Sequence, residues 1–326
     1  MKIKFAHDYI SIISLENLLE AWREFVRGKR SRKDVQEFEI NLMGNIIGLH
    51  NDLLTKNYRH SPYEAFNISD PKPRNIHKAN VRDRLLHYAI YRRLYPFFDE
   101  TFIADSYSCR LGKGTHKAMN RFRTFAYKVS QNHTRTVWVL KCDIKKFFAS
   151  IDQEMLIKIL KENILNEDII WLLSQIIKSF NSGKSGKGLP LGNLTSQLLV
   201  NIYMNEFDQF MKHKLKIEHY IRYADDFVIL SHEKSILEEL LPKIGDYLSE
   251  ELKLDLHPDK IFIKTISSGV DFLGWVHFTN HRVLRTSARN KMLRRLKYNF
   301  KPETIASYLG LLGHGNTYIL KSKVSV

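Results

Sequence analysis

The sequence predicts an α+β protein, because two kinds of hydrophobic periodicity occupy different parts of the chain. Apolar residues recur every three or four positions through residues 9–58, 155–180 and 235–252, which is the period of amphipathic helices. Short runs rich in β-branched and aromatic residues predict strands at residues 137–144, 219–231 and 272–276, and residues 254–263 predict a turn followed by a strand. Within 219–231, two apolar runs flank a pair of acids, which predicts a β-hairpin and hence antiparallel pairing.

The net charge limits the classes of partner. The 326 residues include 51 Lys and Arg against 35 Asp and Glu, a formal charge of +16. An excess of this size points to a polyanion, most often nucleic acid. No basic amphipathic helix dominates the sequence and no run of about 18 apolar residues occurs, so we expect no membrane partner.

Cysteine usage and the N-terminus bear on the compartment. Cys109 and Cys142 are the only cysteines, too few for a disulfide framework or a zinc site. The first residues lack the long apolar core of a signal peptide. We therefore expect a reducing, cytoplasmic location.

Helices are expected first, through residues 9–58, interrupted by a basic loop at 27–33. That loop is explained equally well as a solvated linker or as an RNA contact. Prolines then hold residues 70–73 extended, and six basic side chains follow within 72–84. Such a density of basic groups suits a triphosphate, which Arg grips with a bidentate fork. Residues 106–118 resemble an anion-binding loop, although their spacing differs from that of a P-loop.

The apolar strand at 137–144 carries Asp143 near its end. An unpaired acid there is unfavourable unless a cation or a partner neutralises it, so Asp143 is a candidate metal ligand. Asp152 differs, because Ser150 to Gln153 has the form of a helix capping box. Helix-start chemistry therefore explains Asp152 better than metal binding.

The hairpin at 219–231 contains the strongest candidate site. Asp225 and Asp226 are adjacent at its tip, between apolar runs, where two carboxylates repel each other. The alternative is that both are simply turn residues, since Asp is favoured in turns. Together with Asp143, they could hold two divalent ions roughly 3.5–4 Å apart, which would activate a 3′-hydroxyl and stabilise a leaving pyrophosphate.

Two further stretches carry basic groups. Residues 181–197 predict a flexible basic loop and a Pro-Gly turn before a long amphipathic helix. The tail from 282 to 323 is basic and predicted to be helical. Its densest cationic patch, which could grip a duplex backbone, is formed by Arg285, Arg289, Lys291, Arg294, Arg295 and Lys297.

In this order, the motifs resemble those of reverse transcriptases, over roughly residues 60–320. Asp143 matches the first catalytic acid of that family, and Tyr223-Ala224-Asp225-Asp226 matches its Tyr-x-Asp-Asp box. Lys260 resembles the lysine that follows the palm helix. Phe272-Leu273-Gly274-Trp275 resembles the primer grip.

The resemblance implies a right-hand polymerase. N-terminal helices and fingers would occupy residues 1–135, a palm of antiparallel sheet packed on helices 136–278, and a short helical thumb 279–326. The loop at 181–197 would contact the template from the fingers. The implied reaction is RNA-templated DNA synthesis by two-metal nucleotidyl transfer.

The resemblance also implies roles for individual residues. Asp143, Asp225 and Asp226, with the Ile144 carbonyl, would hold two Mg²⁺ ions, for which Mn²⁺ could substitute. Lys260 would protonate the pyrophosphate as a general acid; otherwise it is a surface lysine. The incoming dNTP would meet Lys72, Arg74, Arg110 and Phe148, the last in the place of the aromatic that crowds a 2′-OH. Nucleic-acid contacts would come from Tyr223, Phe272, Leu273, Gly274, Trp275, Arg289, Arg294 and Arg295.

One segment narrows the resemblance. Leu191-Gly192 stands where most group II intron and retroviral enzymes carry Gln-Gly, and Gln197 stands where Pro would be; all three would contribute to the nucleotide site. This form is similar to reverse transcriptases of diversity-generating retroelements, where loss of the Gln is associated with errors opposite template adenine. An apolar Leu cannot hydrogen-bond the nucleotide, so selection would depend on shape.

Alternatives stay open at this point. Compact relatives serve phage defence, accompany CRISPR systems or belong to group II-like elements. The lack of a maturase-like extension after residue 326 argues against a complete group II intron protein, and retron signatures are absent. A non-catalytic RNA-binding protein on a polymerase fold fits the +16 charge equally well, but it would have no reason to keep three carboxylates together.

The resemblance implies several partners. These are an RNA template, a DNA or RNA primer, dNTPs and, for the diversity-generating class, a small basic accessory protein. A thumb this short makes dependence on a protein partner plausible.

Overall fold

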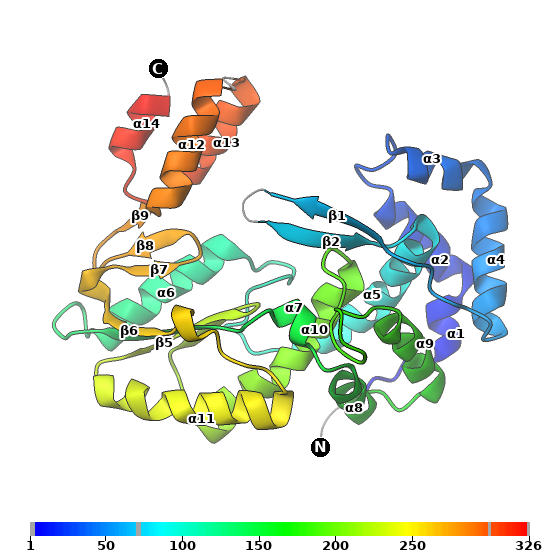
Figure 1. Cartoon of the computed structure of the whole chain (residues 1–326), viewed down its shortest axis with the longest axis horizontal. Helices are drawn as coiled ribbons and strands as arrows, with labels where there is room; N and C mark the ends of the chain where they lie inside the picture. Colours follow the sequence, from blue (N-terminus) through cyan, green and yellow to red (C-terminus); the bar gives the residue numbers. More distant parts are fainter. Residues whose placement is uncertain (1–3, 70–72, 299–300, 325–326) are drawn as a thin grey trace. The chain divides into compact units, whose positions relative to one another are not determined.

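The structure is a computed structural model that describes residues 4–69, 73–298 and 301–324 (Figure 1). The chain forms two compact units built from interleaved segments. Unit 1 comprises Met1–Ala104, Ile144–Phe210 and Asp246–Asp255, and unit 2 comprises the three intervening and following segments, Asp105–Asp143, Met211–Gly245 and Leu256–Val326. The expected fingers, palm and thumb boundaries stay a prediction. Within the described part of the chain, no helix combines the length and apolarity needed to cross a membrane.

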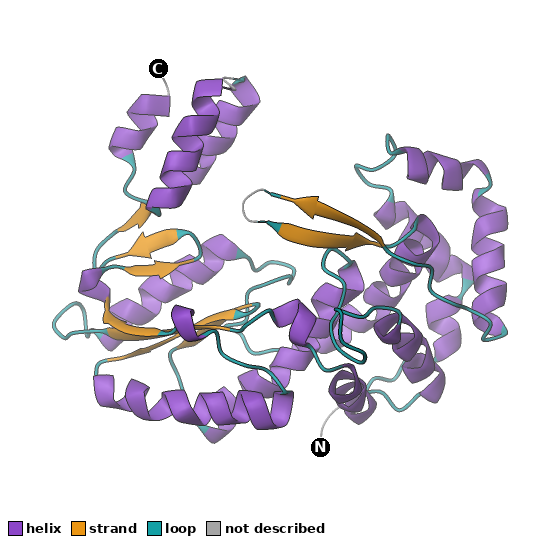
Figure 2. Ribbon diagram, in the orientation of Figure 1, coloured by secondary structure: helices purple, strands orange, loops and turns teal. Residues whose placement is uncertain are grey.

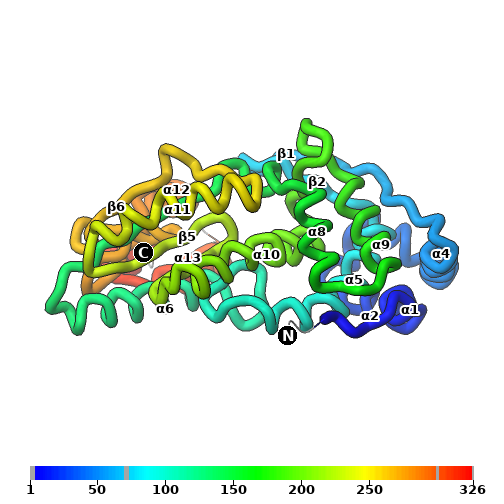
Figure 3. Tube along the Cα trace, turned by 90° about the horizontal axis from the view of Figure 1, so that it is seen from below, coloured from blue at the N-terminus to red at the C-terminus, as the bar shows by residue number. Residues whose placement is uncertain are grey.

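Unit 1 is mainly helical. Its helices are α1 (Tyr9–Ile13), α2 (Leu15–Phe25), α3 (Lys33–Ile40), α4 (Leu42–Leu54), α5 (Val81–Thr101), α7 (Phe147–Ser150), α8 (Gln153–Asn163), α9 (Glu167–Lys178) and α10 (Leu194–Gln209). α10 packs along α5, and α8 lies beside α9 (Figure 3). The antiparallel hairpin of β1 (Glu64–Ile68) and β2 (Arg74–Lys78) belongs to the same unit. The helices expected through residues 9–58 are therefore present, with the basic loop between α2 and α3.

Helix starts in unit 1 follow local capping chemistry. The side chain of Asn80 accepts a hydrogen bond from the Asp83 N–H at the start of α5, satisfying one of the free amides of the first turn. Asp152 does the same for Met155 at the start of α8. The expected capping box was wrong in its cap: Asp152, not Ser150, caps α8, so Gln153 is the first residue of the helix rather than its third. Helix-start chemistry at Asp152 is confirmed.

Unit 2 contains the two larger sheets (Figure 2). The first has the order β4-β5-β3-β6, with every neighbouring pair antiparallel, and consists of β3 (Trp138–Asp143), β4 (Tyr220–Tyr223), β5 (Asp226–Ser231) and β6 (Phe262–Thr265). The second consists of β7 (Val270–Phe272), β8 (Trp275–His277) and β9 (Arg282–Leu284), also antiparallel. The hairpin expected at 219–231 is confirmed. The single strand expected at 272–276 was wrong, because a turn at Leu273 and Gly274 divides it between β7 and β8.

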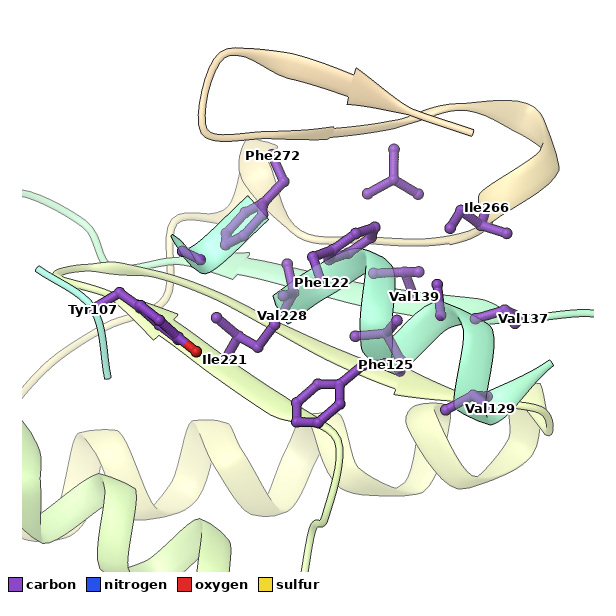
Figure 4. Packing of buried hydrophobic residues seen from close by; sticks show 14 residues of the cluster. Tyr107, Phe122, Phe125, Val129, Val137, Val139, Ile221, Val228, Ile266 and Phe272 are labelled. Atoms are coloured by element: carbon purple, nitrogen blue, oxygen red, sulfur yellow. The ribbon is translucent and has the colours of Figure 1, made fainter. Parts of the chain in front are cut away.

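Helix α6 (Thr115–Val129) covers one face of the four-stranded sheet. Phe122 and Phe125 of α6 pack against Val139, Val228 and other strand residues in one buried cluster (Figure 4). Alternate strand residues face the opposite way, toward α11 (Lys234–Leu252), which runs along that side of the sheet (Figure 1). The part of α11 that belongs to unit 2 carries the buried residues Leu237, Leu240 and Ile244. The sheet thus has two apolar faces, which explains the almost continuous hydrophobic runs of β4 and β5.

In the described part of the chain, β9 is followed by the helices α12 (Thr286–Tyr298), α13 (Pro302–Leu312) and α14 (Tyr318–Val324), which lie side by side (Figure 1). Met292 and Leu296 of α12 and Leu312 of α13 pack in a second buried cluster with Trp275. The helical tail expected from residue 282 is therefore confirmed, apart from the short strand β9 at its start.

Candidate active site

A tight turn presents the two adjacent acids. Tyr223 and Asp226 form the last pair of the β4–β5 ladder, so Ala224 and Asp225 alone make the loop. Ala224 has φ +56, a left-handed backbone conformation that residues other than glycine rarely adopt. The loop is short enough to hold both carboxylates close to the strand ends.

The third acid lies on the neighbouring strand. Asp143 is the last residue of β3 and is paired directly with Asp226, the first residue of β5. Side chains of directly opposed residues project from the same face, with Cβ atoms about 4.5–5.5 Å apart. The sheet therefore brings Asp143 and Asp226 together at one end of the paired strands, with Asp225 one residue away.

Two lysines neutralise this cluster. The Nζ of Lys141 lies 3.3 Å from an Asp226 carboxylate oxygen and also donates to the Asp271 carbonyl at 2.9 Å. The Nζ of Lys260 donates to Oδ1 of Asp143 at 2.7 Å. The structure thus places Lys260 beside Asp143, and its predicted role as a general acid stays a prediction. Lys141 was missed; its signal was its position two residues before Asp143, on the same face of the strand.

The negative charge of the Asp226 carboxylate is only partly neutralised by its neighbours. Burial raises the pKa of Asp226 to about 6, Lys141 opposes the rise, and the charges of Asp143 and Asp225 add to it. The Oδ1 of Asp226 is buried and has no hydrogen-bond partner among the described residues. An uncompensated buried oxygen is unfavourable unless a cation binds it.

The donor set can be compared with what a divalent ion requires. Carboxylate oxygens, with a backbone carbonyl such as that of Ile144, are the ligands that Mg²⁺ and Mn²⁺ prefer. The free Oδ1 of Asp226 fits such an ion. In the part of the chain that the structure describes, however, no three His, Cys, Asp or Glu side chains converge at metal-ligand spacing, and the lysines occupy two of the carboxylates.

A buried arginine, Arg222, is hydrogen-bonded to the backbone of the turn. Arg222, on β4, is fully buried, and its guanidinium donates to the Ala224 carbonyl and to Ser106 Oγ, both at 3.1 Å. The backbone of Arg222 also bonds to Asp105 and Tyr107, which fastens residues 105–107 along the edge of β4. Sequence reasoning missed Arg222; an arginine inside an apolar strand, next to the acids, was the available signal.

Arg110 and Tyr223 are fixed near this edge. Arg110 donates to the Ser106 carbonyl at 3.1 Å, so the same segment that meets Arg222 carries it. The Tyr223 hydroxyl accepts a hydrogen bond from Thr115 Oγ1 at 3.2 Å at the start of α6. Arg110 is therefore the predicted triphosphate ligand that shares unit 2 with the carboxylates.

The other predicted nucleotide residues belong to unit 1. The Leu191 carbonyl accepts from the His77 N–H at 3.0 Å, which places Leu191 and Gly192 against β2. Gly192 has φ +111, and a Cβ there would lie 2.8 Å from Ile76, so the position requires glycine. Gln197 lines the same cavity of about 370 Å³ as Ile76 and Gly192.

Three further predicted nucleotide residues have different outcomes. Phe148, half-buried on α7, accepts a backbone hydrogen bond from Leu189 at 2.8 Å and packs edge-on against Phe147, consistent with its alternative as a core residue. Arg74 is exposed at the start of β2. Lys72 lies outside the described residues.

The predicted nucleic-acid contacts divide into buried and exposed groups. Phe272 and Trp275 are buried on either side of the β7–β8 turn, while Leu273 and Gly274 form the turn itself. The arginines of α12 point to solvent, and the three predicted contacts among them are Arg289, Arg294 and Arg295. Phe272 and Trp275 thus stabilise the fold whatever their neighbours in the turn contact.

Comparison with known proteins decides the family. Residues 68–277, which include Asp143, Asp225, Asp226 and Lys260, match the family model described as reverse transcriptase (RNA-dependent DNA polymerase). The chain belongs to this family. It is therefore an RNA-directed DNA polymerase, a nucleotidyltransferase, and its antiparallel sheets with flanking helices fit the α+β fold of such polymerases.

Named relatives of this reverse transcriptase are mostly intron-encoded. The chain is 27% identical to protein YkfC of Escherichia coli K12, over 76% of this chain and 73% of that protein. It is 21% identical to the putative COX1/OXI3 intron 2 protein of Saccharomyces cerevisiae, over 70% of this chain and 33% of the relative. It is also 21% identical to the group II intron-encoded protein LtrA of Lactococcus lactis, over 63% of this chain and 44% of that protein. The matches thus span less than half of these two intron proteins.

Proposed function

We propose that the chain is the reverse transcriptase of a group II intron-like element and makes cDNA on an RNA template at Asp143, Asp225 and Asp226. The relatives named as intron proteins favour this element over a diversity-generating retroelement. The observation that carries the site is the direct pairing of Asp143 with Asp226 in a chain of this family, with Asp225 next to it.

In this proposal, each acid has a defined part. Asp143, Asp225 and Asp226, with the Ile144 carbonyl, would hold two Mg²⁺ ions, for which Mn²⁺ could substitute. When bound, such ions lower the pKa of a 3′-hydroxyl and stabilise charge on the leaving pyrophosphate. Lys141 keeps Asp226 ionised near neutral pH, because its ammonium opposes the rise in the pKa of that buried carboxyl.

Lys260 is proposed to handle the proton on the leaving group. Its Nζ is hydrogen-bonded to Asp143 and its side chain is 46% exposed, so it can exchange this partner for a phosphate oxygen. It would then donate a proton to the pyrophosphate as the phosphodiester forms. Removal of the ammonium is expected to slow synthesis at all dNTP concentrations.

The substrates are assigned from the remaining predicted residues. Lys72, Arg74 and Arg110 bind the triphosphate of a dNTP, because guanidinium and ammonium groups neutralise the growing charge on the phosphates. Phe148, Leu191, Gly192 and Gln197 shape the nucleotide site. The primer and the RNA template contact Tyr223, the segment from Phe272 to Trp275, and Arg289, Arg294 and Arg295 of α12.

Primer extension tests this function. Purified chain, a defined RNA template with a DNA primer, dNTPs and Mg²⁺ should yield extended product, and chelation with EDTA should abolish it. The double variant Asp225→Asn/Asp226→Asn should lose at least about a thousandfold in rate, because the carboxylate charge is removed without a change in shape. Asp259→Asn is the matched control, since its side chain is 88% exposed. Extension by the double variant at the wild-type rate would refute the site.

A second candidate rests on Leu191. The diversity-generating class, with its small basic accessory protein, is favoured by Leu191 standing where Gln is usual, in a segment held against β2. Sequencing the extension products distinguishes the two elements. Errors concentrated opposite template adenine, and reduced in Leu191→Gln, would support the mutagenic enzyme; equal error rates in both proteins would leave only the group II-like one.

A further inference from the structure

Unit 2 has a cavity to which the polymerase reaction assigns no residue. It encloses about 330 Å³ between the C-terminal half of α6, the β8–β9 turn and the loop that joins α13 to α14. Ligand pockets generally fall between about 300 and 1,000 Å³, so this one is large enough for a single nucleotide. It adjoins Ile266, whose backbone pairs with Val137 just before β3, whereas Asp143 is at the other end of β3. At about 3.3 Å per residue, the strand separates cavity and acids by roughly 20 Å.

The cavity is cationic. Arg123 and Arg282 both line it, together with histidines, and none of the described lining residues is acidic. Arg123 is exposed on α6 and has no ion-pair partner in the described parts of the chain. Two guanidiniums facing one space without a carboxylate repel each other, so the arrangement favours an anionic ligand between them.

Arg282 is held ready for such a ligand. Its Nε donates to the His314 carbonyl, its Nη2 donates to Asn120 at 3.1 Å, and its guanidinium lies over the Trp275 ring at 5.9 Å. The remaining nitrogen, Nη1, is buried and has no partner among the described residues. A buried donor without an acceptor is unfavourable, and a phosphate oxygen would satisfy it.

An aromatic pair provides a surface for a base. The rings of Phe278 and His281 lie 4.9 Å apart and nearly parallel, at 14°, across the β8–β9 turn. Both residues line the cavity, as do the polar side chains of Asn280 and Asn316. Flat rings beside guanidiniums are the elements with which proteins bind unpaired bases and their phosphates.

A second hollow continues the first. It encloses about 260 Å³, shares Ala126, Ile266 and Thr279 with the first cavity, and adds Arg135. Its described lining residues likewise include no acid. The two hollows together form a basic groove along α6 that is longer than one nucleotide requires.

We propose that this groove is a second nucleic-acid site, which binds a single-stranded segment of the polynucleotide outside the polymerase centre. One phosphate lies between Arg123 and Arg282, one unpaired base stacks on Phe278 and His281, and the backbone continues toward Arg135. A duplex does not fit this description, because its base faces are already stacked. Such a site would tether the substrate RNA to the enzyme between rounds of synthesis.

Binding to a fluorescein-labelled oligouridylate, followed by anisotropy in the full-length protein, tests the proposal. Saturating unlabelled template–primer duplex is present throughout, so that the polymerase centre is occupied. Arg123→Ala should weaken binding and reduce the slope of log K against log salt by about 0.7, the value for one phosphate contact on a single strand. Phe278→Ala should weaken binding several-fold without changing that slope, because stacking releases no counterion.

Lys128→Ala is the matched control, since Lys128 is an exposed cation of α6 outside both hollows. Equal slopes and affinities for wild type, Arg123→Ala and Lys128→Ala would overturn the proposal. Displacement of the oligomer by uridine monophosphate at equal concentration would also overturn it, because a mononucleotide site would then remain.

A direct measurement supplements the binding series. Photocrosslinking of a 4-thiouridine oligomer, followed by mass spectrometry, should label the peptide that contains Phe278 and His281. Labelling confined to other peptides would contradict the site. This test uses the wild-type protein, so it holds even if one of the variants is unstable. Both tests omit dNTPs, and Arg123→Ala should retain wild-type extension on a short template. A result against the groove would therefore leave the proposed polymerase function intact, and a result against the polymerase function would leave the groove intact.

Discussion

Two hairpins of unit 2 have the same kind of tight two-residue turn but carry different side chains beside it. The β4–β5 and β7–β8 hairpins each turn through two residues, and each places a residue other than glycine at positive φ, Ala224 at +56 and Leu273 at +53. Beside the first turn lie carboxylates that require lysines for neutralisation. Beside the second lie Phe272 and Trp275, which are buried. The same turn geometry therefore holds charged residues of the candidate site in one hairpin and buried aromatic residues that stabilise the fold in the other.

The largest expected effect is on the aromatic hairpin. Trp275→Ala should lower the free energy of unfolding by about 3–5 kcal/mol, because it leaves a cavity where the buried indole contacts α12 and α13. Urea denaturation measures the loss. Tyr298→Ala, which removes an aromatic that is 81% exposed, is the control and should change stability little. Similar losses in both variants would contradict the structural role of this hairpin.

The acidic hairpin should behave in the opposite way. The pKa of Asp226 is about 6 in the folded chain and 3.8 when unperturbed, so ionisation of this group opposes folding. Its stabilising contribution is complete below pH 3.8 and is lost as the pH rises through 6. At pH 7, without divalent ions, Asp226→Asn should therefore be more stable than wild type by up to about 3 kcal/mol.

The gain should vanish in stages as the pH falls from 7 to 4, which thermal or urea unfolding at several pH values can follow. Asp259→Asn, at a largely exposed position, should show no such trend. A variant that is less stable than wild type at pH 7 would show that Lys141 outweighs the effect of burial. The same substitution abolishes the proposed catalysis, so stability and activity should separate at Asp226.

Arg222 tests how far the acidic turn depends on its support. Arg222→Gln should reduce stability by about 2 kcal/mol, since it leaves the Ala224 carbonyl and Ser106 hydroxyl without their charged donor. If the arginine also positions the acids, the concentration of Mg²⁺ needed for half-maximal extension should rise. Arg23→Gln, on an arginine that is 72% exposed, serves as the control. An unchanged Mg²⁺ requirement would confine Arg222 to a structural role.

The smallest effect concerns the turn backbone. Ala224→Gly removes the steric penalty of the left-handed conformation, about 1 kcal/mol. It also raises the conformational entropy of the unfolded chain, which lowers the stability of the folded state by about 0.5 kcal/mol. We expect a net gain of about 0.5 kcal/mol, measured by urea denaturation against Gly274→Ala at the other hairpin. Gly274 has φ +85, so its alanine variant should be destabilised. A loss of stability in Ala224→Gly would mean that the turn is not strained.

Local sequence patterns predicted much of this protein. The 3.6-residue periodicity of residues 9–58 and 235–252 corresponds to real helices, because an amphipathic helix needs only its own stripe of apolar residues. The hairpin around Asp225 was equally visible. The capping box at Ser150 and the undivided strand at 272–276 were wrong, since a one-residue change of cap or a two-residue turn leaves the hydrophobic pattern nearly unchanged.

The sequence by itself determined the family, the choice of the three candidate acids and the basic character of the chain. Those properties depend on residue type and order. Only the tertiary structure decided which groups meet, because strand register and loop packing are long-range. Lys141 lies beside Asp226, Arg222 donates to the carbonyl of the acidic turn, and Arg123 and Arg282 line one cavity although 159 positions separate them in the chain. No local pattern encodes those pairings, since each requires a sheet or a helix to bring together segments far apart in sequence.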